Sequence, residues 1–111
     1  MRIVPHPLLE RDIIGMAEHV HAVSGDGNAV RRRIVEAREL LGGVQDNPNL
    51  GAPLAGKLAG WRVRHGGKHR QISVVYRHDT KTNRLYLALV AFGEQDWMGR
   101  VTGRRNHLFG Q

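Results

Sequence analysis

The side chains most suited to chemistry gather in one short stretch, GWRVRHGGKHRQISVVY, which runs from Gly60 to Tyr76. Four cations are interleaved here with two histidines: Arg62, Arg64, Lys68, Arg70, His65 and His69. Arginine offers a planar fork of donors that fits phosphate oxygens, and histidine titrates near neutral pH. The stretch therefore suits the binding of a phosphate group, with a histidine as candidate proton acceptor. The alternative is a sheet surface that basic side chains keep soluble.

The same stretch has the two-residue alternation of a β-hairpin, and Gly66–Gly67 is typical of a tight turn. Counting outward from this turn places His65 opposite Lys68, Arg64 opposite His69, Arg62 opposite Gln71, and Trp61 opposite Ile72. Directly opposed residues share a face of the sheet. We therefore expect an apolar face toward the helices, made of Trp61, Val63, Ile72 and Val74. The outer face is expected to hold Arg62, Arg64, His69 and Gln71, with Lys68 and Arg70 near the tip.

The apolar pattern predicts the elements that must position this hairpin. Residues 2–4 (RIV) are compatible with a short strand, and a helical stripe follows from Leu9 to Val20. The segment SGDGN ends this helix, and Asp26 or Asn28 can cap a second helix whose stripe runs from Val30 to Val44. A loop rich in glycine and proline (42–56) leads to the hairpin. A turn at 78–83 then leads to the apolar strand 84–92.

These elements predict an α+β fold in the order β-α-α-β-β-β, with a helical hairpin packed on a small, mostly antiparallel sheet. We expect a single domain over residues 1–98. Residues 99–111 are basic, rich in glycine and aperiodic, and they are expected to form a flexible C-terminal tail.

Composition narrows the classes of function. The 111 residues include 17 Lys and Arg against 10 Asp and Glu, and this net charge of +7 favours a polyanionic partner. No apolar run is long enough to cross a membrane, and no cysteine is present for a disulfide or a thiolate metal site. We expect a cytoplasmic protein with no membrane partner. His6, His19 and His21 complete no metal site, because His19 and His21 lie on different faces of a helix; no metal and no cofactor are predicted.

The layout resembles the RelE/ParE superfamily of toxins from bacterial type II toxin–antitoxin systems. The resemblance rests on the helix AVRRRIVEARELL, the linker NPNLGAPLAGKLAGWRVR, and the strands HRQISVVYRHD and RLYLALVAFG, and it covers residues 1 to about 98. It implies a toxin held inactive by a cognate antitoxin, whose acidic, partly disordered segment suits a +7 chain. It also implies one of two targets: messenger RNA on the ribosome for RelE-like members, or DNA gyrase for ParE-like members.

Carried to this sequence, the resemblance implies a metal-independent ribonuclease site at Arg62, Arg64 and Arg70. Such a site needs cations for the charge on phosphorus and a base, for which His69 or His65 is a candidate. The predicted contacts to the target are Lys57, Arg62, Arg64, His65, Lys68, Gln95 and Trp97.

The sequence also departs from the RelE-like pattern. Ser73 lies nearer than Arg70 to the place of the arginine after the turn. The basic residue expected after the last strand is missing from FGEQDW, and Trp97 is the nearby aromatic residue where the family has tyrosine. Catalysis is therefore left open. The alternative is a non-catalytic basic module with a degenerate toxin fold that binds nucleic acid or protein.

Overall fold

The computed structural model describes the backbone of residues 1–93 and 96–109, and the side chains of these residues as far as Arg104. The strands of this part form one sheet in the order β1-β5-β4-β3-β2. They are β1 (Arg2–Pro5), β2 (Ala52–Pro53), β3 (Arg62–Gly66), β4 (Ile72–Asp79) and β5 (Arg84–Phe92). The helices are α1 (Leu9–Ser24), α2 (Gly27–Asp46) and α3 (Trp97–Phe109), with short 3-10 turns η1 (Gly56–Leu58) and η2 (Lys68–Arg70).

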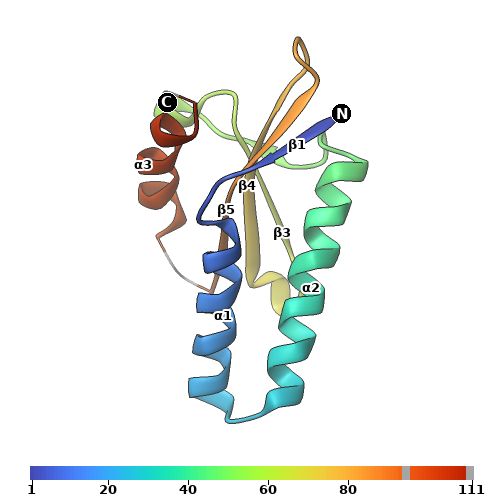
Figure 1. Ribbon diagram of the computed structural model, residues 1–111, viewed down its shortest axis with the longest axis vertical. Helices are drawn as coiled ribbons and strands as arrows, with labels where there is room; N and C mark the ends of the chain where they lie inside the picture. The colour runs from blue at the N-terminus through green and yellow to red at the C-terminus, as the bar shows by residue number, and fades with distance from the viewer. Residues whose placement is uncertain (94–95, 110–111) are drawn as a thin grey trace.

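Helices α1 and α2 form the expected antiparallel hairpin along the long axis of the molecule (Figure 1). Gly25 ends α1 in the left-handed conformation, with φ of 64°, which glycine adopts without steric cost. The Asp26 side chain then accepts a hydrogen bond of 2.9 Å from the Asn28 backbone N–H and caps α2. The predicted cap and helix order are confirmed.

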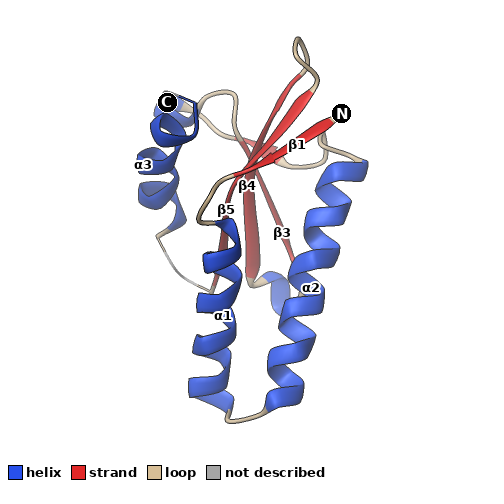
Figure 2. Cartoon of the chain, in the orientation of Figure 1, coloured by secondary structure: helices blue, strands red, loops and turns tan. Residues whose placement is uncertain are grey.

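The sheet is mixed but mostly antiparallel, as predicted, because only β1 runs parallel to its neighbour (Figure 2). Ile3 of β1 lies opposite Leu85 of β5. Strand β5 lies between β1 and β4, which explains its almost wholly apolar sequence. The fold is therefore α+β, with the short strand β2 and helix α3 added to the predicted order.

The two faces of the sheet carry separate apolar clusters. The face under α1 and α2 includes Ile72, Val74 and Tyr76 of β4, together with the helix stripes. The opposite face carries Trp61, Val63, Val75 and Leu89, with Val101 from α3. A sheet covered on both faces needs apolar residues at successive positions, and Val74 and Val75 are both fully buried.

The predicted hairpin register is wrong, because it assumed that only one face of the sheet is buried. Arg62 lies opposite Tyr76 rather than Gln71, an offset of five positions, and an odd offset exchanges the faces of a strand. Arg62 and Arg64 therefore share a face with Val74, on the side of α1 and α2. The predicted apolar face of Trp61, Val63, Ile72 and Val74 is wrong, as is the outer face of Arg62, Arg64, His69 and Gln71. The connection is no two-residue turn: it spans residues 67–71 and contains η2.

Helix α3 closes an open edge of β5. Strand β1 pairs only as far as Leu87, so the following part of β5 has a free edge in the described structure. Asp12 of α1 accepts a hydrogen bond from the Val90 N–H at 3.0 Å, and Arg104 of α3 donates to the Ala88 carbonyl at 3.0 Å. The Asp12 carboxylate, 2% exposed, is paired with Arg104 at 2.5 Å and with Arg100 at 2.8 Å.

The sequence predicted a flexible tail from Gly99, but residues 99–104 lie within α3 and Val101 is fully buried. The helix was not expected because its anchoring residues form no clear periodic pattern in the sequence. These residues are the apolar Val101 and the two arginines that contact Asp12, Arg100 and Arg104. No helix in the described residues has the length and apolar character needed to cross a membrane.

Tyr76 holds the loop between α2 and β2 against the sheet. Its hydroxyl is fully buried with the rest of the ring, donates to the Pro48 carbonyl at 2.7 Å and accepts from the Gly51 N–H at 2.9 Å. Gly51 packs so closely that a Cβ there would lie 2.3 Å from the Tyr76 hydroxyl. This loop delivers Leu50 and Ala52 to the edge of β3.

Candidate functional site

A basic hollow lies where β2 separates from β3. Strand β2 pairs with β3 only through Arg62 and Val63, so residues 64–66 have no strand beside them on this side in the described structure. The resulting hollow, of about 310 Å³, is lined by Leu50, Ala52, Val63, Arg64, His65 and Arg70. Three of these side chains are basic and none is acidic. We call this site the β3-edge hollow.

Arg64 is the most unusual residue of the hollow. Its guanidinium lies against α2, where Gly43 makes room: a Cβ at Gly43 would be 3.1 Å from Arg64 Nη2. Arg64 Nη1 is buried and has no hydrogen-bond partner among the described residues. Burying a charged group without a partner costs free energy. Arg64 therefore brings a positive charge to the lining of the hollow, although this particular nitrogen is closed to solvent.

His65 is oriented by the neighbouring strand. Its Nδ1 lies 2.7 Å from the hydroxyl of Ser73, directly opposite on β4, and Ser73 is buried. The contact with Ser73 restrains the imidazole ring, which lines the hollow. Ser73, considered from the sequence as a departure from the family pattern, contacts His65 and does not itself line the hollow.

The η2 turn brings Arg70 to the same hollow. The Lys68 N–H donates to Glu36 Oε1 of α2 at 3.0 Å, and Arg33 holds the other carboxylate oxygen at 2.9 Å. His69 and Arg70 both have φ of 56°, in the left-handed region that non-glycine residues rarely adopt. Such conformations cost on the order of 1–3 kcal/mol each, and they persist where surrounding contacts hold them. Glu36 provides such a contact from a distant element.

Arg62 does not belong to the hollow. Its Nη1 donates to the Gly51 carbonyl at 2.7 Å and lies 3.4 Å from the Asn49 carbonyl. These bonds bind the α2–β2 loop to β3, so the guanidinium has a structural partner already. The two arginines that were predicted to face outward as a pair therefore differ in role: Arg62 binds the loop, and Arg64 lines the hollow.

The structure brings together only some of the site residues that the sequence predicted. Arg64, His65 and Arg70 line the hollow, and Lys68 and His69 are exposed on the adjacent turn. Lys57 is exposed in η1 and Trp97 packs against the second apolar cluster, so neither lines the hollow. Gln95 lies outside the described residues. Leu50, Ala52 and Glu36 were missed because their roles depend on contacts between distant segments.

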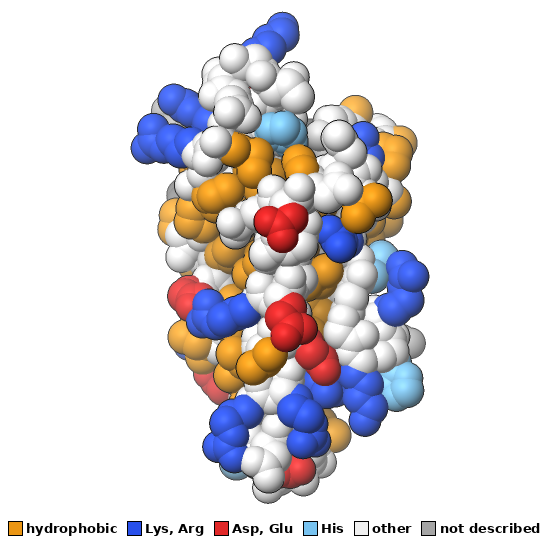
Figure 3. All heavy atoms as spheres, turned by 90° about the vertical axis from the view of Figure 1, so that its right-hand side faces the viewer, with side chains coloured by type: hydrophobic (Ala, Val, Ile, Leu, Met, Phe, Trp, Pro, Cys, Tyr) orange, Lys and Arg blue, Asp and Glu red, His pale blue; other side chains and the backbone are white. Residues whose placement is uncertain are grey.

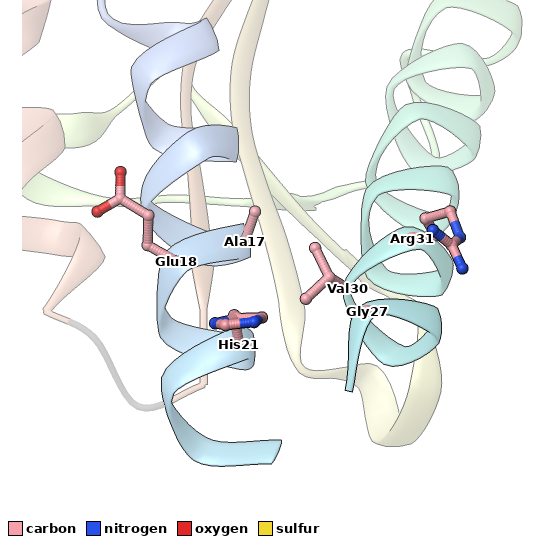
Figure 4. Close-up of a pocket in the computed structure, with 6 residues that line it drawn as sticks. All are labelled: Ala17, Glu18, His21, Gly27, Val30 and Arg31. Atoms are coloured by element: carbon pink, nitrogen blue, oxygen red, sulfur yellow. The ribbon is translucent and has the colours of Figure 1, made fainter. Parts of the chain in front are cut away.

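A second hollow, of about 420 Å³, lies between the ends of α1 and α2. Figure 4 shows Ala17, His21 and Val30 facing the gap, whereas Glu18 and Arg31 point away from it. The charged groups do not converge here, so this gap offers no chemistry comparable to the β3-edge hollow.

Basic side chains also spread well beyond the hollow. Figure 3, which views the α2 side, shows Lys and Arg side chains at the top, along the flanks and near the lower end, with hydrophobic and acidic side chains between them. Helix α2 itself carries three exposed arginines, Arg31, Arg32 and Arg38. The long-range field of this surface attracts polyanions without specifying one.

The fold is that of the RelE/ParE toxins. A chain of the chromosomal ParDE toxin–antitoxin system from P. aeruginosa matches with a TM-score of 0.63 and 16% identity, over 85% of this chain and 97% of the other. The toxin–antitoxin complex RelBE2 from Mycobacterium tuberculosis matches with a TM-score of 0.55 and 17% identity, over 82% and 95%.

The YoeB/ParE toxin from Agrobacterium tumefaciens also matches, with a TM-score of 0.55 and 21% identity, over 83% of this chain and 98% of the other. No family model and no curated protein matches this sequence. The structural matches confirm the fold that the sequence resemblance implied.

Proposed function

We propose that this protein is the toxin of a type II toxin–antitoxin system. The observation that carries the proposal is the shared fold, which spans 82–85% of the chain in matches to three toxin–antitoxin proteins. The β3-edge hollow supports it, because the hollow gives this fold a cationic site on the hairpin that the resemblance singled out.

The chemistry of the hollow favours ribosome-bound messenger RNA as the target. Arg64 and Arg70 supply cations for a phosphate group, and His65 supplies a nitrogen that can accept the proton of a ribose 2′-hydroxyl. Attack of that oxygen on the adjacent phosphorus forms a 2′,3′-cyclic phosphate and breaks the bond to the 5′-oxygen of the next nucleotide, which takes a proton from water as it leaves. The two arginines stabilise the negative charge that develops on the phosphate oxygens.

DNA gyrase is the second candidate target, and the position of Arg62 favours it. The RelE-like pattern implies that Arg62 and Arg64 act together, but Arg62 is held by the α2–β2 loop. A toxin that binds gyrase needs no such catalytic pair. The basic surface would then serve only for contact with the target.

Controlled expression tests both targets. We expect the wild-type protein to arrest growth, and Arg64→Gln and Arg70→Gln to relieve the arrest. Arg32→Gln, which removes the same charge from an exposed position of α2, should leave it intact. Mapped messenger RNA ends and plasmid supercoiling then separate the two targets. Absence of growth arrest by the folded wild-type protein would favour the non-catalytic binding module.

A further inference from the structure

A short two-stranded ribbon projects from the sheet at the end opposite the β3-edge hollow (Figure 1). It consists of the last residues of β4, the turn 80–83 and the first residues of β5, and we call it the β4–β5 ribbon. Strand β3 begins opposite Tyr76, so β4 beyond this residue has no strand beside it on that side in the described structure. The two ends of β4, Ile72 and Asp79, lie about 24 Å apart in an extended strand. The ribbon is therefore separate from the hollow.

Hydrogen bonds hold the turn of the ribbon in one shape. The Asp79 carboxylate accepts from the Lys81 N–H at 3.0 Å and lies 3.4 Å from the Thr82 nitrogen. Asn83 has φ of 53°, a left-handed conformation that asparagine tolerates better than most residues. Its carbonyl accepts from the Arg2 N–H of β1 at 3.0 Å. A turn that is already ordered loses less conformational entropy when it binds a partner.

The ribbon and the start of β1 are strongly basic. Arg2 lies directly opposite Arg84 on β5, and together with Arg77 and Lys81 they give four cations against one acid, Asp79. Like charges on directly opposed residues of a sheet are destabilising. The side chains of Arg2 and Arg84 are exposed, and neither has an ion-pair partner among the described residues. An external anion would offset the repulsion between them.

The dimensions of the ribbon match the major groove of B-form DNA. This groove is about 12 Å wide and about 8.5 Å deep, and it admits a two-stranded β-ribbon. At about 3.4 Å per residue, a strand crosses that depth in about two to three residues. The polar turn 80–83 can therefore reach the base edges while Arg77 and Arg84 stay level with the phosphates. Thr82 and Asn83, both exposed, carry hydroxyl and amide groups of the kinds that read base edges.

We propose that the β4–β5 ribbon binds double-stranded DNA, with its turn in the major groove and its arginines on the flanking phosphates. Arg84 and Arg2 hold one phosphate backbone and Arg77 holds the other, each through the planar fork that suits phosphate oxygens. Duplex RNA fits less well, because its major groove is deep, narrow and closed to side chains. The proposal goes beyond the proposed function and does not depend on the target of the toxin.

Fluorescence anisotropy with a labelled DNA duplex of mixed sequence tests the proposal. Arg84→Gln should weaken binding about tenfold, the loss expected for one hydrogen bond to a charged group. It should also make the slope of log K against log salt less steep by about 0.9, the value for one phosphate contact. Arg32→Gln removes the same charge from an exposed position of α2 and should change the affinity less than about twofold. Thermal unfolding of each variant checks that the fold is retained.

Two comparisons on the unaltered protein locate the contact and identify its partner. Backbone amide chemical shifts should change at residues 80–84 when the DNA duplex is added, and an RNA duplex or single-stranded DNA of the same sequence should bind several-fold more weakly. Equal losses from Arg84→Gln and Arg32→Gln, or equal affinity for the three nucleic acids, would overturn the proposal. Shift changes confined to residues 64–70 would overturn it too and would assign DNA to the β3-edge hollow. Displacement of the DNA by polyglutamate at equal charge would instead indicate an acidic protein as the partner.

Discussion

Among the glycines, Gly51 is the position at which an added methyl group should lower the free energy of unfolding most. A Cβ at this position would lie 2.3 Å from the hydroxyl of Tyr76, which is fully buried and held by two hydrogen bonds. We expect Gly51→Ala to destabilise the protein by about 1–3 kcal/mol, the usual cost of overpacking, as measured by chemical denaturation.

Gly27→Ala is the matched control, because a Cβ there meets nothing within 4 Å and lies in α2. Alanine is the better helix former, so this variant should be as stable as the wild type or slightly more stable. Equal destabilisation by both substitutions would contradict the role assigned to Tyr76.

Arg62 and Arg64 are two positions apart but should respond oppositely to mutation. Arg62→Gln removes charged hydrogen bonds to the α2–β2 loop and should cost about 1–2 kcal/mol of unfolding free energy. Arg64→Gln removes a half-buried guanidinium whose buried Nη1 has no partner in the described structure, so stability should stay within about 0.5 kcal/mol or increase.

Denaturation of both variants, together with the growth assay, separates the two roles. The stability loss belongs to Arg62 and the loss of function to Arg64. A large stability loss from Arg64→Gln would show that its guanidinium has a structural role and would weaken the case for the β3-edge hollow.

At the scale of secondary-structure elements, one buried carboxylate, that of Asp12, links α3 to α1 and β5. Asp12 links α1 to Arg100 and Arg104 of α3 and also accepts from the Val90 N–H of β5. Removing one partner of a buried ion pair leaves the other charge uncompensated, at a cost of roughly 3–5 kcal/mol. We expect Asp12→Asn to lose about that much stability and to accelerate amide exchange at Val90.

Glu10→Gln is the comparison for this prediction. Glu10 pairs with Arg38 at 2.9 Å between α1 and α2, but both side chains are exposed. Exposed pairs contribute about 0–1 kcal/mol, so the loss should be small. If both variants were equally stable, α3 would not depend on the Asp12 cluster.

At the scale of the whole molecule, the net charge of +7 makes the binding of any polyanion sensitive to salt. The two arginines in the β3-edge hollow, Arg64 and Arg70, predict a slope of about −1.4 for log K against log salt with single-stranded RNA. Titrations of oligouridylate at several salt concentrations measure this slope. A much steeper slope would mean that the wider basic surface of Figure 3 contributes, rather than the hollow alone.

Sequence patterns over short stretches of the chain were enough to predict most of the helices and strands. The helical stripes, the Asp26 cap and the apolar strand β5 depend on residues close together in the chain, and their order was enough to indicate an α+β fold. The hairpin register was not predictable in this way. Gly66–Gly67 suits a tight turn, but the connection is longer and contacts Glu36, which is distant in sequence, and the pairing differs from the predicted one by an odd number of residues.

The sequence by itself determined the helical hairpin, the order of the four predicted strands along the chain, the positive charge and the segment in which cations and histidines gather. Tertiary structure alone decided which of those side chains meet. Arg62 donates to a loop carbonyl, Arg64 packs against Gly43, and α3 covers the second face of the sheet. The physical reason is that a strand presents alternate residues to opposite faces, so long-range packing sets the role of every side chain along it.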